Sequence, residues 1–319
     1  SIKGKILASK DSKIKIQQVI KDKSFTYKIY FVKNARLYTD RVQDTAVILE
    51  NYIVEGPSHQ LRPINNSKIE NNIVFKKGTP RAIKKLNGTV LSLLTGGAGN
   101  ENYSHWLFDV LPRIGICENI VCKENINFFL FPNLDKKFQK ETIDILKIDK
   151  KKILSSKKFR HISCEQLIVT DHPYCINNDA TKDITNIPSW IIKWLRDKFL
   201  PKKENNDYNP SRFYIDRSDA EINKEQTRKI INEDEVLNFL TNKGFQKVKL
   251  EKLSFLEQVK LFCNAKIVVG LHGAGLANLV FCNSNTKIIE FKNNEKVKQY
   301  ENLAKKNNLH YRSIINKPL

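Results

Sequence analysis

The chain has 319 residues, of which 40% are hydrophobic and 28% charged, and its formal net charge is +21. This length favours two domains with packed cores, and no apolar run approaches the ~20 residues that a membrane-spanning helix needs. An integral membrane protein is therefore not expected. The residues Ser1–Lys5 lack the long apolar continuation of a signal peptide, so no export signal is expected either.

The N-terminal part of the chain is predicted to form short strands. Residues 25–32 and 46–54 are rich in β-branched and aromatic side chains, as strands are. A charged, Asn-rich stretch follows at 65–72. A further strand at 88–94 runs into a glycine-rich loop at 95–100, which we expect to be flexible.

The middle of the chain mixes predicted helices and strands. Helices are predicted at 101–116, 136–146 and 189–199, and strands at 128–131 and 166–170. Residues 201–210 are polar, charged and bracketed by prolines, which is typical of a linker. We therefore expect an N-terminal domain at 1–200 and a C-terminal domain at 201–319.

The C-terminal part shows a regular alternation of strands and helices. Strands are predicted at 213–216, 245–250, 267–271, 287–291 and 310–314, and helices at 233–243, 254–264 (with a capping box of Ser254 and Glu257), after 272–275, and at 296–307. This alternation predicts an α/β fold with a parallel, doubly wound sheet. Ligands bind such sheets at the carboxyl ends of the strands.

A glycine-rich turn, His272-Gly273-Ala274-Gly275, joins the 267–271 strand to a predicted helix. N–H groups at a helix N-terminus and the helix dipole favour an anion there, and glycine lets a phosphate approach the backbone. The spacing differs from the dinucleotide-binding pattern G-x-G-x-x-G. The turn therefore predicts a site for a nucleotide or nucleotide-sugar diphosphate, and a purely structural tight turn is the alternative.

Two further groups of residues lie where such chemistry would need them. Arg217 follows the 213–216 strand, and the guanidinium group of arginine can donate two hydrogen bonds at once to diphosphate oxygens. Arg228 is a second candidate in the same basic segment. A solvated arginine, or a salt bridge to Asp219 or Glu233, is the alternative. Glu290, near the end of the next strand, is a candidate acceptor for ribose hydroxyls or an ordinary charged strand end.

His105 and Asp109 are four residues apart, so on a helix they share one face and their side chains can meet. A carboxylate beside an imidazole raises its basicity, which suits a general base. We favour His105 as the base with Asp109 as its orienter; the reverse assignment and a simple surface pair remain open.

No Asp-x-Asp box follows an apolar strand, so neither a catalytic metal nor a cofactor is expected. The six cysteines form no CxxC pair, which favours reduced thiols and a cytoplasmic location. The charge of +21 has three readings: a genome that encodes lysine freely, docking on an anionic inner membrane face, or a non-catalytic protein that binds nucleic acid or acidic polysaccharide. No nucleic-acid motif appears, so nucleic acid is the less favoured partner.

Three segments, in their order and spacing, resemble glycosyltransferase family 61: NYSHWLFDVLPRI, RSDAEINKEQTRKIINEDEV and GLHGAGLANLVFCNSNTKIIEF. This family includes plant xylan and N-glycan pentosyltransferases and animal O-linked N-acetylglucosaminyltransferases of the endoplasmic reticulum. Many bacterial members lie in capsule or lipopolysaccharide gene clusters. The resemblance covers about 99–314, and the first ~90 residues carry no recognisable family motif.

The resemblance implies a GT-B fold, in which two Rossmann-like domains face a central cleft. It also implies metal-independent transfer of a sugar, with inversion, from a nucleotide sugar such as a UDP-sugar to a glycan acceptor. If the positive charge docks the protein on an inner membrane face, a lipid-linked glycan is the expected acceptor. By position, the acceptor-side residues are Asn102, His105, Trp106, Asp109 and Arg113, and the donor-side residues are Arg217, Arg228, His272, Gly273, Ala274, Gly275, Asn278 and Glu290. His272 is a candidate contact to the sugar or phosphate.

Overall fold

The computed structural model describes residues 6–7, 11–22, 25–39, 45–58, 68–94, 101–177, 179–202, 210–217 and 230–315. The predicted loop at 95–100, most of the predicted linker and Arg228 lie outside these residues. The chain divides into two compact units: the first is Ser1–Ile184 with Pro188–Ile191, and the second is Thr185–Ile187 with Ile192–Leu319. The chain thus passes from one unit to the other between 184 and 192, and the predicted linker falls within the second unit.

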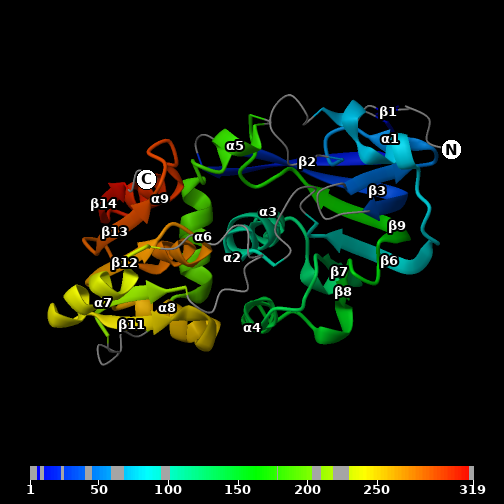
Figure 1. The fold of residues 1–319 in the computed structure, drawn as a ribbon. Coiled ribbons are helices and arrows are strands. Elements are labelled where there is room, and N and C mark those ends of the chain that lie inside the picture. Colours follow the sequence, from blue (N-terminus) through cyan, green and yellow to red (C-terminus); the bar gives the residue numbers. More distant parts are fainter. Residues whose placement is uncertain are drawn as a thin grey trace. The chain divides into compact units, whose positions relative to one another are not determined.

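The first unit is built on a mixed sheet, which Figure 1 shows beside its helices. Its strand order is β1-β5-β4-β3-β9-β6-β7-β8, with β2 paired to β3. The strands are β1 (Ile6–Leu7), β2 (Ile14–Asp22), β3 (Phe25–Thr39), β4 (Thr45–Leu49), β5 (Tyr52–Val54), β6 (Lys84–Ser92), β7 (Phe128–Phe131), β8 (Ile153–Ser155) and β9 (His161–Thr170). The predicted 46–54 strand is therefore two strands, joined at Glu50, which has a φ of 57°.

Half of this sheet is parallel. Strand β6 pairs in parallel with β7 on one side and with β9 on the other, and β7 pairs in parallel with β8. The order β8-β7-β6-β9 corresponds to strands 3-2-1-4 of a doubly wound sheet, whose switch point lies between its first and fourth strands. The antiparallel half begins at β3, which pairs with β9 and extends well beyond the predicted 25–32.

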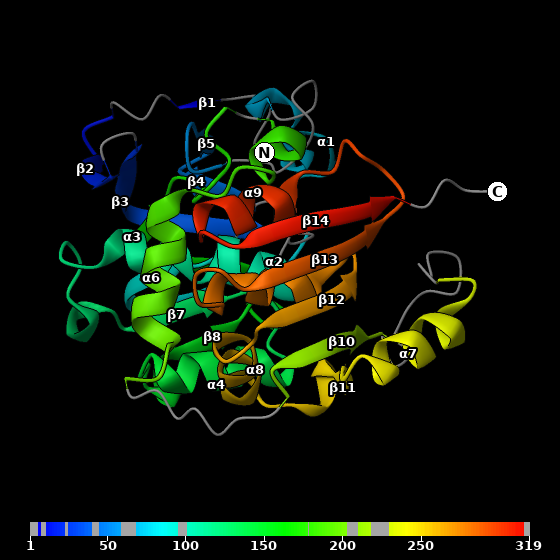
Figure 2. The same cartoon turned by 90° about the vertical axis from the view of Figure 1, so that its left-hand side faces the viewer.

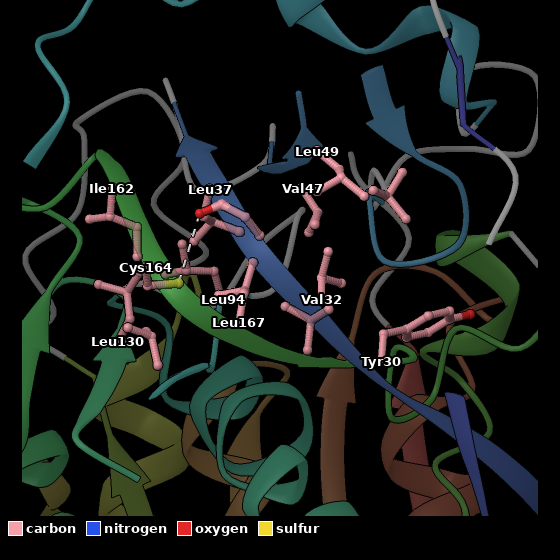
Figure 3. Packing of buried hydrophobic residues seen from close by; sticks show 14 of the residues in the cluster. Tyr30, Val32, Leu37, Val47, Leu49, Leu94, Leu130, Ile162, Cys164 and Leu167 are labelled. Atoms are coloured by element: carbon pink, nitrogen blue, oxygen red, sulfur yellow. Dashed lines mark hydrogen bonds between the residues drawn. The ribbon is translucent and has the colours of Figure 1, made fainter. Parts of the chain in front are cut away.

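The core of the first unit lies against this sheet, as Figure 3 shows. Val32 and Leu37 of β3 pack in one cluster with Cys164 and Leu167 of β9 and with Leu130 of β7. Strands that are buried on such a surface position the loops at their ends, because close packing leaves little room for shifts.

The described helices of this unit are η2 (Ile69–Asn71), α1 (Ile73–Lys77), α2 (Tyr103–His105), η3 (Trp106–Val110), α3 (Pro112–Cys117), η4 (Lys123–Asn125), α4 (Lys137–Ile145), η5 (Lys150–Lys152) and α5 (Ala180–Asp183).

The predicted 101–116 helix is helical but not uniform. Between α2 and α3, the segment η3 is a π-helical turn, and the N–H of Leu111 donates to the carbonyl of Trp106 at 3.1 Å. Pro112 supplies the reason, because it has no N–H and its ring disfavours a continuous α-helix before it. Such π-turns occur frequently at functional sites.

The second unit contains a five-stranded parallel sheet in the order β11-β10-β12-β13-β14, seen in Figure 2. Its strands are β10 (Arg212–Asp216), β11 (Gln246–Lys249), β12 (Ile267–Leu271), β13 (Lys287–Lys292) and β14 (His310–Ile315). The helices are α7 (Glu233–Asn242), η7 (Leu250–Lys252), α8 (Phe255–Cys263), η8 (Ala274–Phe281) and α9 (Gln299–Lys306); α6 (Ser189–Phe199) starts in the first unit. The predicted parallel α/β sheet is confirmed.

The strand order of the second unit is the flavodoxin-like 2-1-3-4-5, whose switch point lies between β10 and β12. The capping box on α8 is present, with Ser254 and Glu257 bonded to each other's backbone N–H. In the part of the chain that the structure describes, no helix is both long and apolar enough to cross a bilayer.

Candidate functional site

Both units place chemically active side chains at a switch point between neighbouring parallel strands. In the first unit these residues follow the carboxyl ends of β6 and β9, and we call them the His105 cluster: His105, Asp109, Arg113, His172 and Tyr174. Asn102 begins this segment by capping α2, since its side chain accepts from the N–H of Ser104 at 2.9 Å and of His105 at 3.2 Å. The cap fixes the backbone at His105.

Asp109 is the buried centre of the cluster, with an exposed fraction of 0%. Its Oδ1 lies 3.3 Å from Nη2 of Arg113 and 3.1 Å from Nε2 of His172. Its Oδ2 is also buried and has no hydrogen-bond partner. Asp109 therefore makes its direct contacts with Arg113 and His172. Its effect on His105 is electrostatic, without a direct hydrogen bond, and raises the pKa of that imidazole.

His172 connects Asp109 to the loop that follows β9. Its Nδ1 accepts from the backbone N–H of Cys175 at 3.0 Å and of Tyr174 at 3.3 Å. Because Nδ1 accepts, the hydrogen of the neutral ring is on Nε2, the atom that faces Asp109. Burial lowers the pKa of His172, and the nearby Asp109 opposes this only in part.

Tyr174 is the contact that joins His105 to the rest of the cluster. Its hydroxyl lies 3.2 Å from Nδ1 of His105, and its ring packs edge-on against His172 with centroids 4.5 Å apart. Burial raises the pKa of Tyr174 well above its usual range, so the phenol stays protonated. Burial likewise lowers the pKa of His105, which is therefore neutral near pH 7 and able to take a proton.

Trp106 and Arg113, which were expected on the acceptor side, are buried. Trp106 has no exposed surface; its Nε1 donates to Thr142 at 2.9 Å and its ring stacks on Phe131. Arg113, 4% exposed, also reaches Thr170 at 3.4 Å. An acceptor cannot touch either side chain in this structure. Trp106 instead anchors the helix through Thr142 and Phe131, and Arg113 balances the buried charge of Asp109.

The second unit places the glycine turn, His272–Gly275, at the carboxyl end of β12. Arg217 comes directly after β10, the neighbouring strand across the switch point, and its Nη1 donates to the carbonyl of His272 at 2.8 Å. A Cβ on Gly273 would lie 2.6 Å from that Nη1. The φ of Gly273 is 167°, an ordinary extended value, so a side chain here would not strain the backbone but would displace the guanidinium of Arg217 from the turn.

The segment after the turn differs from the predicted α-helix. Residues Ala274–Phe281 form a 3₁₀-helix, and Gly273 at its start supplies no capping side chain. Its first N–H groups thus remain open to an anion, although a 3₁₀-helix leaves fewer of them than an α-helix. Gly275 allows close packing, since a Cβ there would lie 2.9 Å from Cδ1 of Leu250.

Two predicted donor-side residues are engaged within the protein. Asn278 is 0% exposed and donates to Gln258 at 3.0 Å and to the carbonyl of Gly275 at 3.2 Å, so it holds the turn against α8. Glu290 is 1% exposed and bonds Nδ1 of His272 and the hydroxyl of Tyr311. Glu290 is therefore too buried to accept from a ribose in this structure, and it orients His272 instead.

Sequence reasoning missed His172, Tyr174 and Tyr311. His172 could have been found, because it lies two residues after the predicted 166–170 strand, at a carboxyl end. Tyr174 and Tyr311 carry no such signal, since their roles arise from tertiary contacts. Among the described residues, no group of three His, Cys, Asp or Glu side chains is arranged to hold a metal ion.

Comparison with known proteins identifies the class to which this arrangement belongs. Residues 103–289, more than half of the chain, match the model of the family described as Glycosyltransferase 61. The matched range includes both the His105 cluster and the glycine turn. The chain belongs to the glycosyltransferase 61 family, a family of sugar-transferring enzymes.

Individual relatives match a shorter stretch. The chain is similar to the EGF domain-specific O-linked N-acetylglucosamine transferase of Mus musculus, with 36% identity over 89 residues, and of Drosophila melanogaster, with 37% over 89 residues. The same enzyme of Xenopus laevis is 33% identical over 95 residues. These matches cover 26–28% of this chain and 17–18% of the relatives' own length.

Proposed function

We propose that the chain transfers a sugar from a nucleoside diphosphate sugar to a hydroxyl group of a glycan acceptor. The observation that carries the proposal is the position of Arg217 and the glycine turn on either side of the β10–β12 switch point. An arginine fork and uncapped N–H groups at that point suit a diphosphate, the leaving group of such a donor.

The chemistry of the His105 cluster supports the other half of the reaction. The acceptor oxygen bonds to the anomeric carbon while the bond from that carbon to the diphosphate oxygen breaks. The electron pair leaves with the nucleoside diphosphate, and the acceptor's proton moves to His105. Attack from the face opposite the diphosphate inverts the anomeric centre. Between the two predicted bases, His105 is favoured because Asp109 has no exposed surface.

Several finer statements belong to this proposal. The first unit would act as the acceptor side and the second as the donor side of a GT-B enzyme, with Arg217 and the turn stabilising the departing diphosphate without a metal. The name of the relatives makes UDP-N-acetylglucosamine the first donor to test. The proposed acceptor is a surface polysaccharide such as capsule or lipopolysaccharide. The proposed location of the protein is the cytoplasm, at an anionic inner membrane face.

The proposal is tested first by ligand binding and then by turnover. A thermal-shift series with UDP, GDP, CDP and their sugar conjugates should show one nucleotide that raises the unfolding midpoint, since a ligand of the native state stabilises it. Slow release of UDP from the matching UDP-sugar should follow. No shift with any nucleotide, together with steeply salt-dependent DNA binding, would favour the non-catalytic binding protein instead.

A further inference from the structure

The His105 cluster contains a tyrosine that the proposed reaction does not yet use. Tyr174 is 2% exposed, and its hydroxyl contacts Nδ1 of His105 at 3.2 Å. A contact between a hydroxyl and a neutral imidazole has two arrangements: the O–H donates to Nδ1, or an N–H on Nδ1 donates to the oxygen. The two arrangements give His105 opposite properties at its other nitrogen, Nε2.

The position of Tyr174 decides between these arrangements when His105 acts as a base. Nδ1 of His105 contacts the buried hydroxyl of Tyr174, so Nε2 is the nitrogen left for an acceptor hydroxyl. A neutral imidazole carries one hydrogen, and Nε2 can take a proton only when that hydrogen is on Nδ1. The N–H at Nδ1 then donates to the oxygen of Tyr174, and the phenol keeps its own hydrogen because burial raises its pKa.

His172 holds this geometry in place. It accepts the backbone N–H groups of Tyr174 and Cys175, and its Nε2 faces Asp109 at 3.1 Å. Tyr174 thus cannot move without breaking contacts that begin at the buried carboxylate. A continuous chain of contacts thus runs from Asp109 through His172 and Tyr174 to His105, whose imidazole is partly exposed.

We propose that Tyr174 is a positioning residue for the base His105: its oxygen accepts the hydrogen of Nδ1 and so keeps the lone pair of the base on Nε2. This inference rests on the proposed function. It adds that Asp109 orients His105 through His172 and Tyr174 instead of by the direct contact that the helical spacing predicts. The acceptor's proton then goes to Nε2, and the resulting imidazolium keeps its hydrogen bond to Tyr174.

Tyr174→Phe tests the inference, because it removes the hydroxyl and leaves the ring against His172. The imidazolium loses its acceptor, so the pKa of His105 falls and the acidic limb of the kcat/KM profile moves to lower pH. Turnover should fall about five- to tenfold, because the hydrogen bond that is lost is stronger to the charged imidazolium than to the neutral ring, with the donor KM unchanged. If the Tyr174 O–H instead donated to Nδ1, the limb would move to higher pH. A shift to higher pH, or none, overturns the inference.

A matched control separates this effect from loss of stability. Tyr27 is equally buried in the same unit, and its hydroxyl donates to the carbonyl of Pro173 at 2.7 Å, in the same loop, without touching His105. Tyr27→Phe should lower the unfolding midpoint but leave the pH profile in place. The same shift in both variants would reduce Tyr174 to a structural role and overturn the inference.

A second measurement requires no substrate. Proton-coupled ¹⁵N spectra of histidine-labelled protein report the tautomer and pKa of His105, assigned with His105→Gln. We expect the hydrogen on Nδ1 in the unsubstituted protein and a lower pKa in Tyr174→Phe, with Asp109, Arg113 and His172 as the other charged or titratable groups of the cluster. A hydrogen on Nε2 at neutral pH overturns the inference. If the tautomer is as expected but no nucleotide sugar turns over, the proposed function fails and the geometry stands.

Discussion

The two switch points of the molecule are built in opposite ways. In the first unit, the site consists of titratable side chains, and Asp109, Arg113 and His172 are almost entirely buried. In the second unit, it consists of a backbone turn, a glycine that leaves space and an arginine over it. Burial makes proton affinity adjustable, whereas an open turn with N–H groups makes anion binding possible. One topology thus supports two kinds of chemistry, and the side chains at the strand ends decide which.

The largest expected effect concerns the proton-transfer side of this comparison. His105→Ala should lower kcat by about 10²–10⁴-fold, the usual contribution of a general base, because no other exposed group of the cluster can take the proton. Affinity for UDP, measured by calorimetry, should stay within twofold of the unsubstituted protein. An unchanged kcat would rule out His105 as the base, and a parallel loss of UDP affinity would show that the two sites are not chemically separate.

The second prediction concerns stability and needs no substrate. Asp109→Asn leaves the guanidinium of Arg113 buried without its carboxylate, and breaking a buried ion pair typically costs about 3–5 kcal/mol. Urea unfolding should show a loss of this size. Asp144→Asn is the matched control, because Asp144 is exposed and pairs with Lys150 at 3.3 Å; it should cost less than about 1 kcal/mol. Equal losses in the two variants would mean that the charge of Asp109 does not stabilise the His105 cluster.

How much of this could be foreseen differs between the two units. The second unit was predicted well, because each of its strands and helices carries its own periodic pattern and the carboxyl-end rule then places Arg217 and the turn. In the first unit, β2 was missed because most of its side chains are only partly buried and its pattern is weak. The start of β9 was missed although it is mostly buried, because polar residues such as His161, Ser163 and Glu165 interrupt its apolar pattern. The π-turn at Trp106–Val110 depends on how Pro112 is accommodated, which spacing alone does not give. The role of Tyr174 depends on a contact 69 residues away in sequence.

A smaller effect is expected on the anion-binding side. Arg217→Ala removes a charged donor from the glycine turn, and a hydrogen bond to a charged group is worth about 1.5–3 kcal/mol, so UDP affinity should fall about 10- to 150-fold. Arg212→Ala is the control, because Arg212 lies on the same strand at its amino end, away from the turn. Calorimetry with UDP should separate the two variants. If Arg212→Ala weakened UDP binding as much, the positive charge of the chain and not the turn would hold the nucleotide.

The smallest expected effect follows from three histidines of the first unit whose pKa values burial lowers. Burial lowers the pKa values of His105, His161 and His172. An unfolded histidine has a pKa of about 6.5, so just below that pH the unfolded state binds more protons than the folded state. The free energy of unfolding should therefore fall as the pH drops through that window, and these groups should contribute nothing above it.

Asp171, whose pKa is raised by burial, acts in the opposite direction but only from the lower pH at which carboxyl groups titrate. Urea midpoints between pH 7.5 and 5.5 measure the slope, which should be smaller in His172→Gln; an unchanged slope would mean that His172 already carries its proton in the folded cluster, paired as an imidazolium with Asp109.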